Sequence, residues 1–213
     1  MTDGPRPYGA NEVPRLDSAF YRADPVAVAR RLLGQRLVVV QPDGERLAGL
    51  IVETEAYLGV KDKAAHTYGW RKTERTASMF EPGGTAYVFL NYGIHRLLNL
   101  STGPAGQPTA ILIRAVEPTE GLPRMFERRA KAKAEADLCS GPGKLSQALG
   151  IEMADDGTDT LTSDRLFVER VRGRSLPSKQ IIVRPRIGVD YAGEWAAAPL
   201  RFYVRGNPHV SRR

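Results

Sequence analysis

Two glutamates and a tyrosine alternate along one apolar run of the sequence. The run is IVETEAY, residues 51–57, in which Glu53, Glu55 and Tyr57 stand two positions apart. Side chains of a β-strand alternate between its faces, so these three share one face, with the carboxylates roughly 7 Å apart. The other face carries Val52, Thr54 and Ala56. Acids on an apolar strand are costly to bury without partners, and perturbed acids often act as general acids or bases. The alternative is an edge strand whose acids face water or pair with arginine, and the spacing does not choose between the two.

A histidine and several aromatic residues follow this run. His66 lies in a polar segment, where a lone histidine is more often a hydrogen-bonded structural residue than a catalyst. Tyr87 and Phe89 belong to an apolar run that turns at Tyr92, in the stretch FLNYGIH. Turn tips are usually small and polar because they face water, so a large ring at this place does not fit a core role.

The stretch SGPGKL, residues 140–145, resembles the end of a phosphate-binding P-loop. Leu145 replaces the required Ser or Thr, and Leu138 stands where the first glycine belongs, so a nucleoside-triphosphate site is excluded. What remains is a turn into a helix whose free N–H groups, with Lys144, could hold a single phosphate. An ordinary helix start explains the stretch equally well.

The charge balance favours a polyanionic partner. The net charge is +7, from 31 lysines and arginines against 24 acidic residues. Basic side chains that neutralise phosphates release counterions and gain affinity for nucleic acid, although the same excess can be spread over a solvated surface. The cations cluster, in Arg71, Lys72 and Arg75 and in Arg124, Arg128, Arg129, Lys131 and Lys133.

Several classes of protein are excluded or disfavoured. Cys139 is the single cysteine, so the chain can form neither an internal disulfide nor a thiolate metal cage. His66, His95 and His209 are far apart, and no metal site is expected. The sequence has no apolar stretch long enough to cross a bilayer and no signal-peptide segment. We therefore expect a cytoplasmic protein without membrane attachment, with a flexible lead over residues 1–14 and one domain over residues 15–213.

The helices and strands that would position these residues are predicted from the spacing of apolar residues and from turn signals in the sequence. Apolar residues at helical spacing predict helices over 25–33, 121–136 and 143–149. β-Branched and alternating runs predict strands over 36–40, 47–55, 85–90, 94–100, 110–116, 181–187 and 200–204. Residues 155–164 are polar and are expected to form a surface loop. Strands joined by short turns, without strict alternation with helices, indicate an α+β fold with a mostly antiparallel sheet.

Seven strings together identify the chain as similar to a known family. They are LLGQRLV, GLIVETEAYLG, AAHTYG, GGTAYVFLNYGIHRLLNLS, ILIRAVEP, LCSGPGKLSQALGI and AGEWAAAPLRFYVRG. In this order, from about Ala19 to Arg213, they resemble the alkyladenine, or 3-methyladenine, DNA glycosylases. The resemblance implies a single domain with a curved antiparallel sheet, surrounding helices and a protruding β-hairpin.

The resemblance also implies an activity and a set of site residues. It implies a monofunctional enzyme that flips alkylated or deaminated purines out of double-stranded DNA and hydrolyses the N-glycosidic bond, leaving an abasic site. No cofactor or metal is implied, and we expect a monomer. In this family pattern Glu55 activates the water and Arg114 helps to hold the water or the nucleotide. The base pocket matches Tyr57, His66, Phe89 and Asn99, the intercalating hairpin tip matches Tyr92 with Ile94 beside it, and the expected phosphate contacts are Arg71, Arg75 and Lys144.

The chain departs from the family pattern at places that bear on lesion preference. Phe89 stands where mammalian members have tyrosine, Ile94 replaces a methionine, and the loop over residues 102–107 is longer. We expect alkylated purines to be released faster than hypoxanthine, because Phe89 keeps a stacking face but lacks a hydroxyl. Two alternatives are a non-catalytic nucleic-acid-binding module and, from SGPGK alone, an enzyme acting on a small phosphorylated metabolite.

Overall fold

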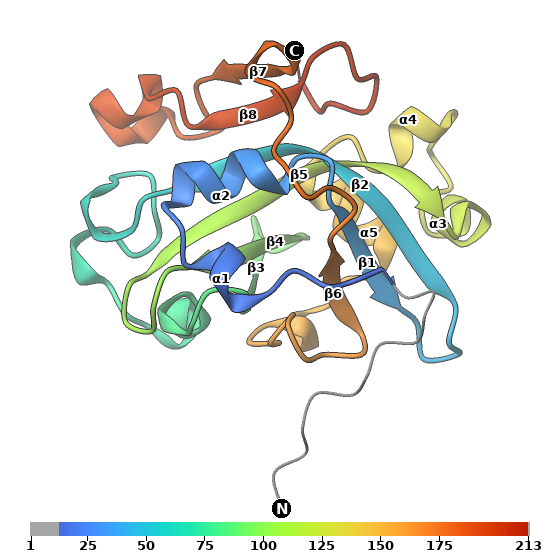
Figure 1. Ribbon diagram of the computed structural model, residues 1–213, viewed down its shortest axis with the longest axis horizontal. Helices are drawn as coiled ribbons and strands as arrows, with labels where there is room; N and C mark the ends of the chain where they lie inside the picture. Colours follow the sequence, from blue (N-terminus) through green and yellow to red (C-terminus); the bar gives the residue numbers. More distant parts are fainter. Residues whose placement is uncertain (1–12, 213) are drawn as a thin grey trace, which may run out of the picture.

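The computed structural model describes residues 13–212 and shows an antiparallel sheet that curls around an apolar core (Figure 1). Within these residues the strands are ordered β3-β4-β5-β2-β1-β6, and β8 pairs with both β2 and β7. Every pairing is antiparallel, which confirms the predicted α+β class. The strands are β1 (Arg36–Val40), β2 (Arg46–Tyr57), β3 (Ala86–Asn91), β4 (His95–Thr102), β5 (Thr109–Glu120), β6 (Leu166–Glu169), β7 (Ile181–Arg184) and β8 (Arg201–Val204).

Short helices surround the sheet. Asp24 begins α2 by accepting hydrogen bonds from the backbone N–H groups of Val26 and Ala27, as its sequence position predicts. The α-helices are α1 (Ser18–Tyr21), α2 (Pro25–Leu32), α3 (Leu122–Arg128), α4 (Glu135–Leu138) and α5 (Pro142–Leu149). The 3₁₀ segments are η1 (Gly59–Lys61), η2 (Tyr68–Trp70), η3 (Glu74–Phe80), η4 (Met153–Asp155), η5 (Ser178–Gln180) and η6 (Asp190–Ala197).

The two faces of the sheet pack against different parts of the molecule. One face packs on the main core, where strand residues such as Ala56 and Ile113 meet Leu32 of α2 and Leu145 of α5. Because side chains alternate along a strand, the intervening residues point to the opposite face. On β2 and β5 these include Tyr57 and Arg114, and this face is covered by segments that lie far apart in the sequence.

Strand β2 is bent where it changes partners. Its first half pairs with β1 and its second half with β8, and bulges interrupt its register with β5 on both sides of Glu53. A bulge adds a residue and shifts the alternation of the strand. The expected face of Val52 is therefore wrong: it packs with Ala115 and Tyr203, apart from the main core that contains Ala56.

The single helix expected over residues 121–136 is also wrong. Helix α3 ends at Arg128, because Arg129 leaves the helical region with φ −115° and ψ 51°. The carboxylate of Asp137 then accepts hydrogen bonds from the N–H groups of Lys133 and Ala134 and starts the separate helix α4. After Phe126 the sequence ERRAKAKAEA carries no large apolar residue to hold a continuing helix against the core.

Residues 155–164 are only partly the expected surface loop. Asp155 is buried and paired with Arg165, and the hydroxyl of Thr160, also buried, donates to the carbonyl of Gly84. Strand β6, which directly follows, is not among the predicted strands, because it is defined by its pairing with β1. The other expected elements occur, with ends that differ by a few residues.

Two expectations concern the ends of the chain and membranes. The expected flexible lead over residues 1–14 falls mainly outside the described residues. Among the helices of residues 13–212, none is long and apolar enough to cross a membrane.

Candidate active site

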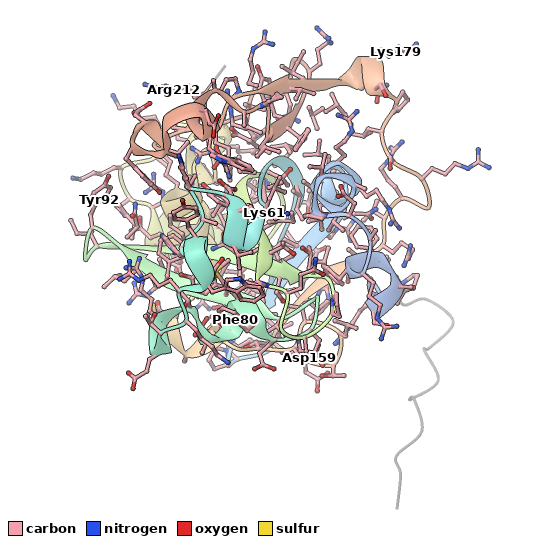
Figure 2. All side chains as sticks on the ribbon, turned by 90° about the vertical axis from the view of Figure 1, so that its left-hand side faces the viewer. Lys61, Phe80, Tyr92, Asp159, Lys179 and Arg212 are labelled. Carbon is pink, nitrogen blue, oxygen red and sulfur yellow. The ribbon has the colours of Figure 1, made fainter. Side chains whose placement is uncertain are left out.

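A pocket of about 270 Å³ opens on the face of the sheet opposite the main core. Strands β2, β3, β4 and β5 form its base, and the segments 64–66, 142 and 187–191 close its sides. The hairpin between β3 and β4 stands at its edge, and Figure 2 shows Tyr92 projecting outward from the molecule there. The polar and aromatic lining residues are Tyr57, His66, Tyr87, Phe89, Asn91, Tyr92, Asn99, Arg114 and Tyr191.

Glu55 lies directly behind this lining and has no exposed surface. Its Oε2 accepts a hydrogen bond from the hydroxyl of Tyr57 at 3.0 Å, and its Oε1 accepts one from the backbone N–H of Ile187 at 2.8 Å. Arg114 Nη1 is 3.4 Å from the same Oε1. All three partners line the pocket. Burial raises the pKa of Glu55 above its ordinary value, although Arg114 and the two hydrogen bonds act to lower it.

Glu53 is equally buried but faces the C-terminal segment. Its Oε1 is 2.8 Å from Arg201 Nη1, and its Oε2 accepts a hydrogen bond from the N–H of Ser211 at 2.7 Å. Arg114 joins the two acids, since its Nε is 3.4 Å from Glu53 Oε1. The two carboxylates share a face as predicted, and the geometry favours Glu55 as the reactive one, because its other partners come from the pocket.

Aromatic rings form one wall of the pocket. Tyr87 and Phe89 are stacked with centroids 5.3 Å apart, and His66 meets Phe89 edge-on at 4.6 Å. His66 Nδ1 and the Tyr87 hydroxyl are 2.7 Å apart and share a hydrogen bond. Burial, helped by the charges of Arg75 and Arg71, lowers the pKa of His66 to about 4, so the ring is neutral at pH 7. Asn99 lies on β4 and donates from Nδ2 to the carbonyl of Tyr87 at 3.2 Å.

A buried ion pair that the sequence analysis missed holds the pocket together. Arg186 and Asp62 are both completely buried, with N···O distances of 2.5 and 2.8 Å. The Arg186 guanidinium also lies 4.7 Å from the centroid of the Tyr57 ring, and the next residue, Ile187, donates to Glu55. Asp62 accepts from the N–H of Ala64, which lines the pocket. No spacing signal in the sequence connects two residues so far apart.

The hairpin tip is exposed and conformationally strained. Tyr92 is 87% exposed with φ +49°, and Gly93 follows with φ +69°. Ile94 closes the turn by donating its N–H to the carbonyl of Asn91, and its side chain is 70% exposed. Positive φ is uncommon for a bulky residue, because its Cβ approaches the backbone.

The predicted phosphate-contact residues lie near the pocket. Arg75 donates to the carbonyl of Leu90 at 3.4 Å and lies over the Phe89 ring at 5.1 Å. Lys144 is in the first turn of α5, where Pro142 lines the pocket, and its Nζ is 3.3 Å from the Ser140 hydroxyl. The SGPGK turn therefore belongs to the same site as the hairpin.

Three members of the second basic cluster have structural partners instead, including Arg129, which donates to Gln147. Arg124 pairs with Asp43 and Glu45, and Arg128 donates to Gln41 and to the carbonyl of Ala148. These contacts use the three side chains to join α3 and the residue that follows it to neighbouring segments. Across residues 13–212, no cluster of three histidine, cysteine or acidic side chains could hold a metal ion.

Comparisons with known proteins identify the family of this chain. The family model described as methylpurine-DNA glycosylase matches residues 19–208. A protein of Bacillus cereus (strain ATCC 10987 / NRS 248), named "Putative 3-methyladenine DNA glycosylase", is 45% identical over 202 residues, which cover 92% of this chain and 98% of that protein. A protein of the same name from Bacillus thuringiensis (strain Al Hakam) gives the same identity and coverage. The predicted resemblance is confirmed, and the chain belongs to the methylpurine-DNA glycosylase family.

Proposed function

We propose that this DNA glycosylase flips alkylated or deaminated purines, of the 3-methyladenine type, out of double-stranded DNA and hydrolyses the N-glycosidic bond. The observation that carries the proposal is the position of Glu55. It is buried behind an aromatic pocket, and a tyrosine, an arginine and a backbone N–H that line the pocket orient its carboxylate. An exposed tyrosine stands on a hairpin at the edge of the same pocket.

Glu55 acts as the general base in this proposal. Its carboxylate takes a proton from water as the water oxygen bonds to the sugar C1′ and the purine leaves with the electrons of the N-glycosidic bond. Negative charge beside C1′ also stabilises the oxocarbenium character of the transition state. Tyr57, Arg114 and the Ile187 N–H hold the carboxylate in place before the reaction, so little reorganisation is needed.

The aromatic wall suits a cationic base. A purine alkylated at N3 or N7 carries positive charge, which is attracted to aromatic faces such as Tyr57 and Phe89. His66 is neutral at pH 7, so it adds a ring to the wall without repelling that charge. Asn99 lies within the pocket. In this proposal its amide contacts the edge of the purine and helps to exclude guanine.

Base flipping is assigned to the hairpin. Tyr92, with Ile94 beside it, enters the minor groove and fills the space of the extruded nucleotide, which offsets part of the cost of unstacking. Arg71, Arg75 and Lys144 bind phosphates and hold the duplex without reading its sequence. In this proposal the enzyme acts as a monomer, in the bacterial cytoplasm and on the nucleoid, where its DNA substrate lies.

The proposed product is an abasic site in an uncut strand. Strand cleavage by a glycosylase requires an amine that forms a Schiff base with C1′. None of the described residues that line the pocket is a lysine. Strand breaks produced by the pure protein without alkali would contradict this assignment.

A single-turnover assay tests the proposal. Duplexes that carry 3-methyladenine, 7-methylguanine, 1,N6-ethenoadenine or hypoxanthine are incubated with excess enzyme, and the released base is measured. We expect alkylated purines to be released faster than hypoxanthine, since Phe89 lacks a hydroxyl that could bind a neutral base. Release of no base from any of these duplexes, despite tight binding, would instead support a non-catalytic DNA-binding module.

A further inference from the structure

Several exposed apolar side chains lie on segments that also contribute residues to the pocket or adjoin such residues. Six large ones lie on the hairpin, on η2 or on the segment after Ile187: Tyr68, Trp70, Leu90, Tyr92, Ile94 and Tyr191. Tyr92 and Tyr191 line the pocket itself. Apolar groups concentrated beside cations, rather than scattered singly, mark a surface that meets a partner.

Trp70 shares with Tyr92 a backbone conformation that bulky residues avoid. Among residues 13–212 these two are the non-glycine residues with positive φ, +66° for Trp70 and +49° for Tyr92. Each has a neighbouring glycine in the same conformation, Gly69 and Gly93. The Trp70 side chain is 65% exposed, so core packing does not explain its presence. Backbone strain of this kind is retained at positions where the residue has a role in a functional site.

The turn that carries Trp70 directly follows a pocket residue. The Tyr68 N–H donates to the carbonyl of Ala65, and the Arg71 N–H donates to the carbonyl of Tyr68. Four residues span at most about 14 Å, so the Trp70 backbone lies within this distance of His66. Arg71, in the same turn, also lowers the pKa of His66 through its charge.

The segment after Trp70 reaches the hairpin. Arg75 contacts both the Leu90 carbonyl and the Phe89 ring, as described above. Trp70 is thus followed by Arg71 and Lys72 on a segment that borders both the pocket and the hairpin. An exposed ring beside phosphate-binding cations is the combination that binds unstacked bases.

We propose that Trp70 is a second aromatic contact with DNA, stacking on a base next to the flipped nucleotide while Tyr92 fills the vacated space. This inference rests on the proposed function. Extrusion of one nucleotide breaks the stack around it and leaves a neighbouring base face open. An indole offers a large rigid surface for that face, and the flanking cations hold the adjacent phosphates.

Fluorescence provides a direct test, because the chain has only two tryptophans. In Trp195→Phe, Trp70 is the remaining tryptophan. The variant is titrated with a duplex that contains a tetrahydrofuran abasic-site analogue, and binding is followed in parallel by the anisotropy of labelled DNA. We expect quenching of the tryptophan emission that saturates together with the anisotropy. Unchanged intensity and wavelength at saturation would overturn the proposal.

A substitution separates this role from a structural one. Asparagine tolerates positive φ, so Trp70→Asn should keep or raise the Tm while it weakens binding to the same duplex about tenfold. Val171→Asn, at an exposed apolar residue outside the pocket lining and the segments beside it, is the matched control and should bind nearly as wild type does. Equal Kd values for Trp70→Asn and wild type, or a fall in Tm that accounts for the lost binding, would contradict the proposal.

Different results would reject the proposed function and the proposed Trp70 contact. If wild type binds the abasic duplex but releases no damaged base, the proposed function is wrong whatever Trp70 does. If wild type releases the base and Trp70→Asn matches it in Kd and rate, only the Trp70 contact is wrong.

Discussion

Glu55 and Tyr92 border the same pocket, yet one has no exposed surface and the other is 87% exposed. Glu55 is oriented by Tyr57, Ile187 and Arg114, whereas Tyr92 occupies a strained turn at the tip of a two-stranded hairpin. In the proposed function, the pocket floor, meaning Glu55 and these three partners, holds the general base in position before the reaction. The rim, meaning the hairpin tip from Leu90 to Ile94, is exposed, as the proposed contact with DNA requires.

The largest expected effect is on the chemistry at the floor. Glu55→Gln should lower the single-turnover rate of base release by about 10²- to 10⁴-fold, since glutamine cannot take the proton from water. The Tm should stay the same or rise, because a neutral amide is less costly to bury than a carboxylate. A rate equal to that of wild type would exclude Glu55 as the base.

Glu53→Gln is the matched control for that variant. Its two nearest partners, Arg201 and the Ser211 N–H, lie away from the pocket lining, and its contact with Arg114 is longer, at 3.4 Å, so the loss should appear mainly in the Tm. If Glu53→Gln loses rate as severely as Glu55→Gln while remaining folded, the contrast between the two acids is wrong.

The next effect concerns the ion pair that supports the floor. Asp62→Asn leaves the Arg186 charge buried without its partner and should lower the free energy of unfolding by about 3 kcal/mol. In the fraction of this variant that folds, Ile187 is less firmly held, so Glu55 loses part of the hydrogen bonding that lowers its pKa. The acid limb of the profile of rate against pH should therefore move to higher pH. Unchanged urea unfolding and an unchanged pH profile would show that the pair does not position the floor.

Titration of Glu55 should affect rate and stability in opposite directions. Burial raises the pKa of Glu55 above the ordinary value of 4.5. The carboxyl group is therefore ionised, and the excision rate reaches its maximum, only above the raised pKa. Between pH 4.5 and that pKa the folded state holds more protons than the unfolded state, so the free energy of unfolding falls as pH rises. Glu55→Gln should remove this part of the stability slope. Stability that rises across this window with the same amplitude in both proteins would contradict the assignment.

The smallest effect is expected at the rim. Tyr92→Ala should lower the excision rate on a fully paired duplex several-fold. The effect is limited because stacking of the Tyr92 ring on the neighbouring bases offsets only part of the cost of flipping, which is roughly a few kcal/mol. On a lesion placed opposite a gap or mismatch the loss should be smaller, and the Tm should not fall, since the ring contributes little burial. Equal losses on paired and unpaired lesions would argue against a wedge.

Local features of the fold were predictable because neighbouring residues decide them. Asp24 and the apolar spacing after it placed α2, and the alternation of β3 and β4 around Tyr92 placed the hairpin. The break between α3 and α4 was missed because it depends on packing at Phe126 and on a cap from Asp137. Strand β6 is defined by its pairing with β1, a partner that short-range patterns do not reveal.

The sequence by itself predicted, from the two-residue period of a strand, that Glu53, Glu55 and Tyr57 share one face, and Arg114 contacts both carboxylates despite the bulges around Glu53. It also placed an aromatic ring at a turn, and its strings carried the family resemblance. Only the tertiary structure separated the two acids. Arg201 and Ser211 contact Glu53, whereas Ile187 and the pocket wall contact Glu55. Arg201, Ser211 and Ile187 each lie more than a hundred residues along the chain from the acid that they contact. Contacts of that range follow from the curl of the sheet and the path of the C-terminal segment, which no local spacing encodes.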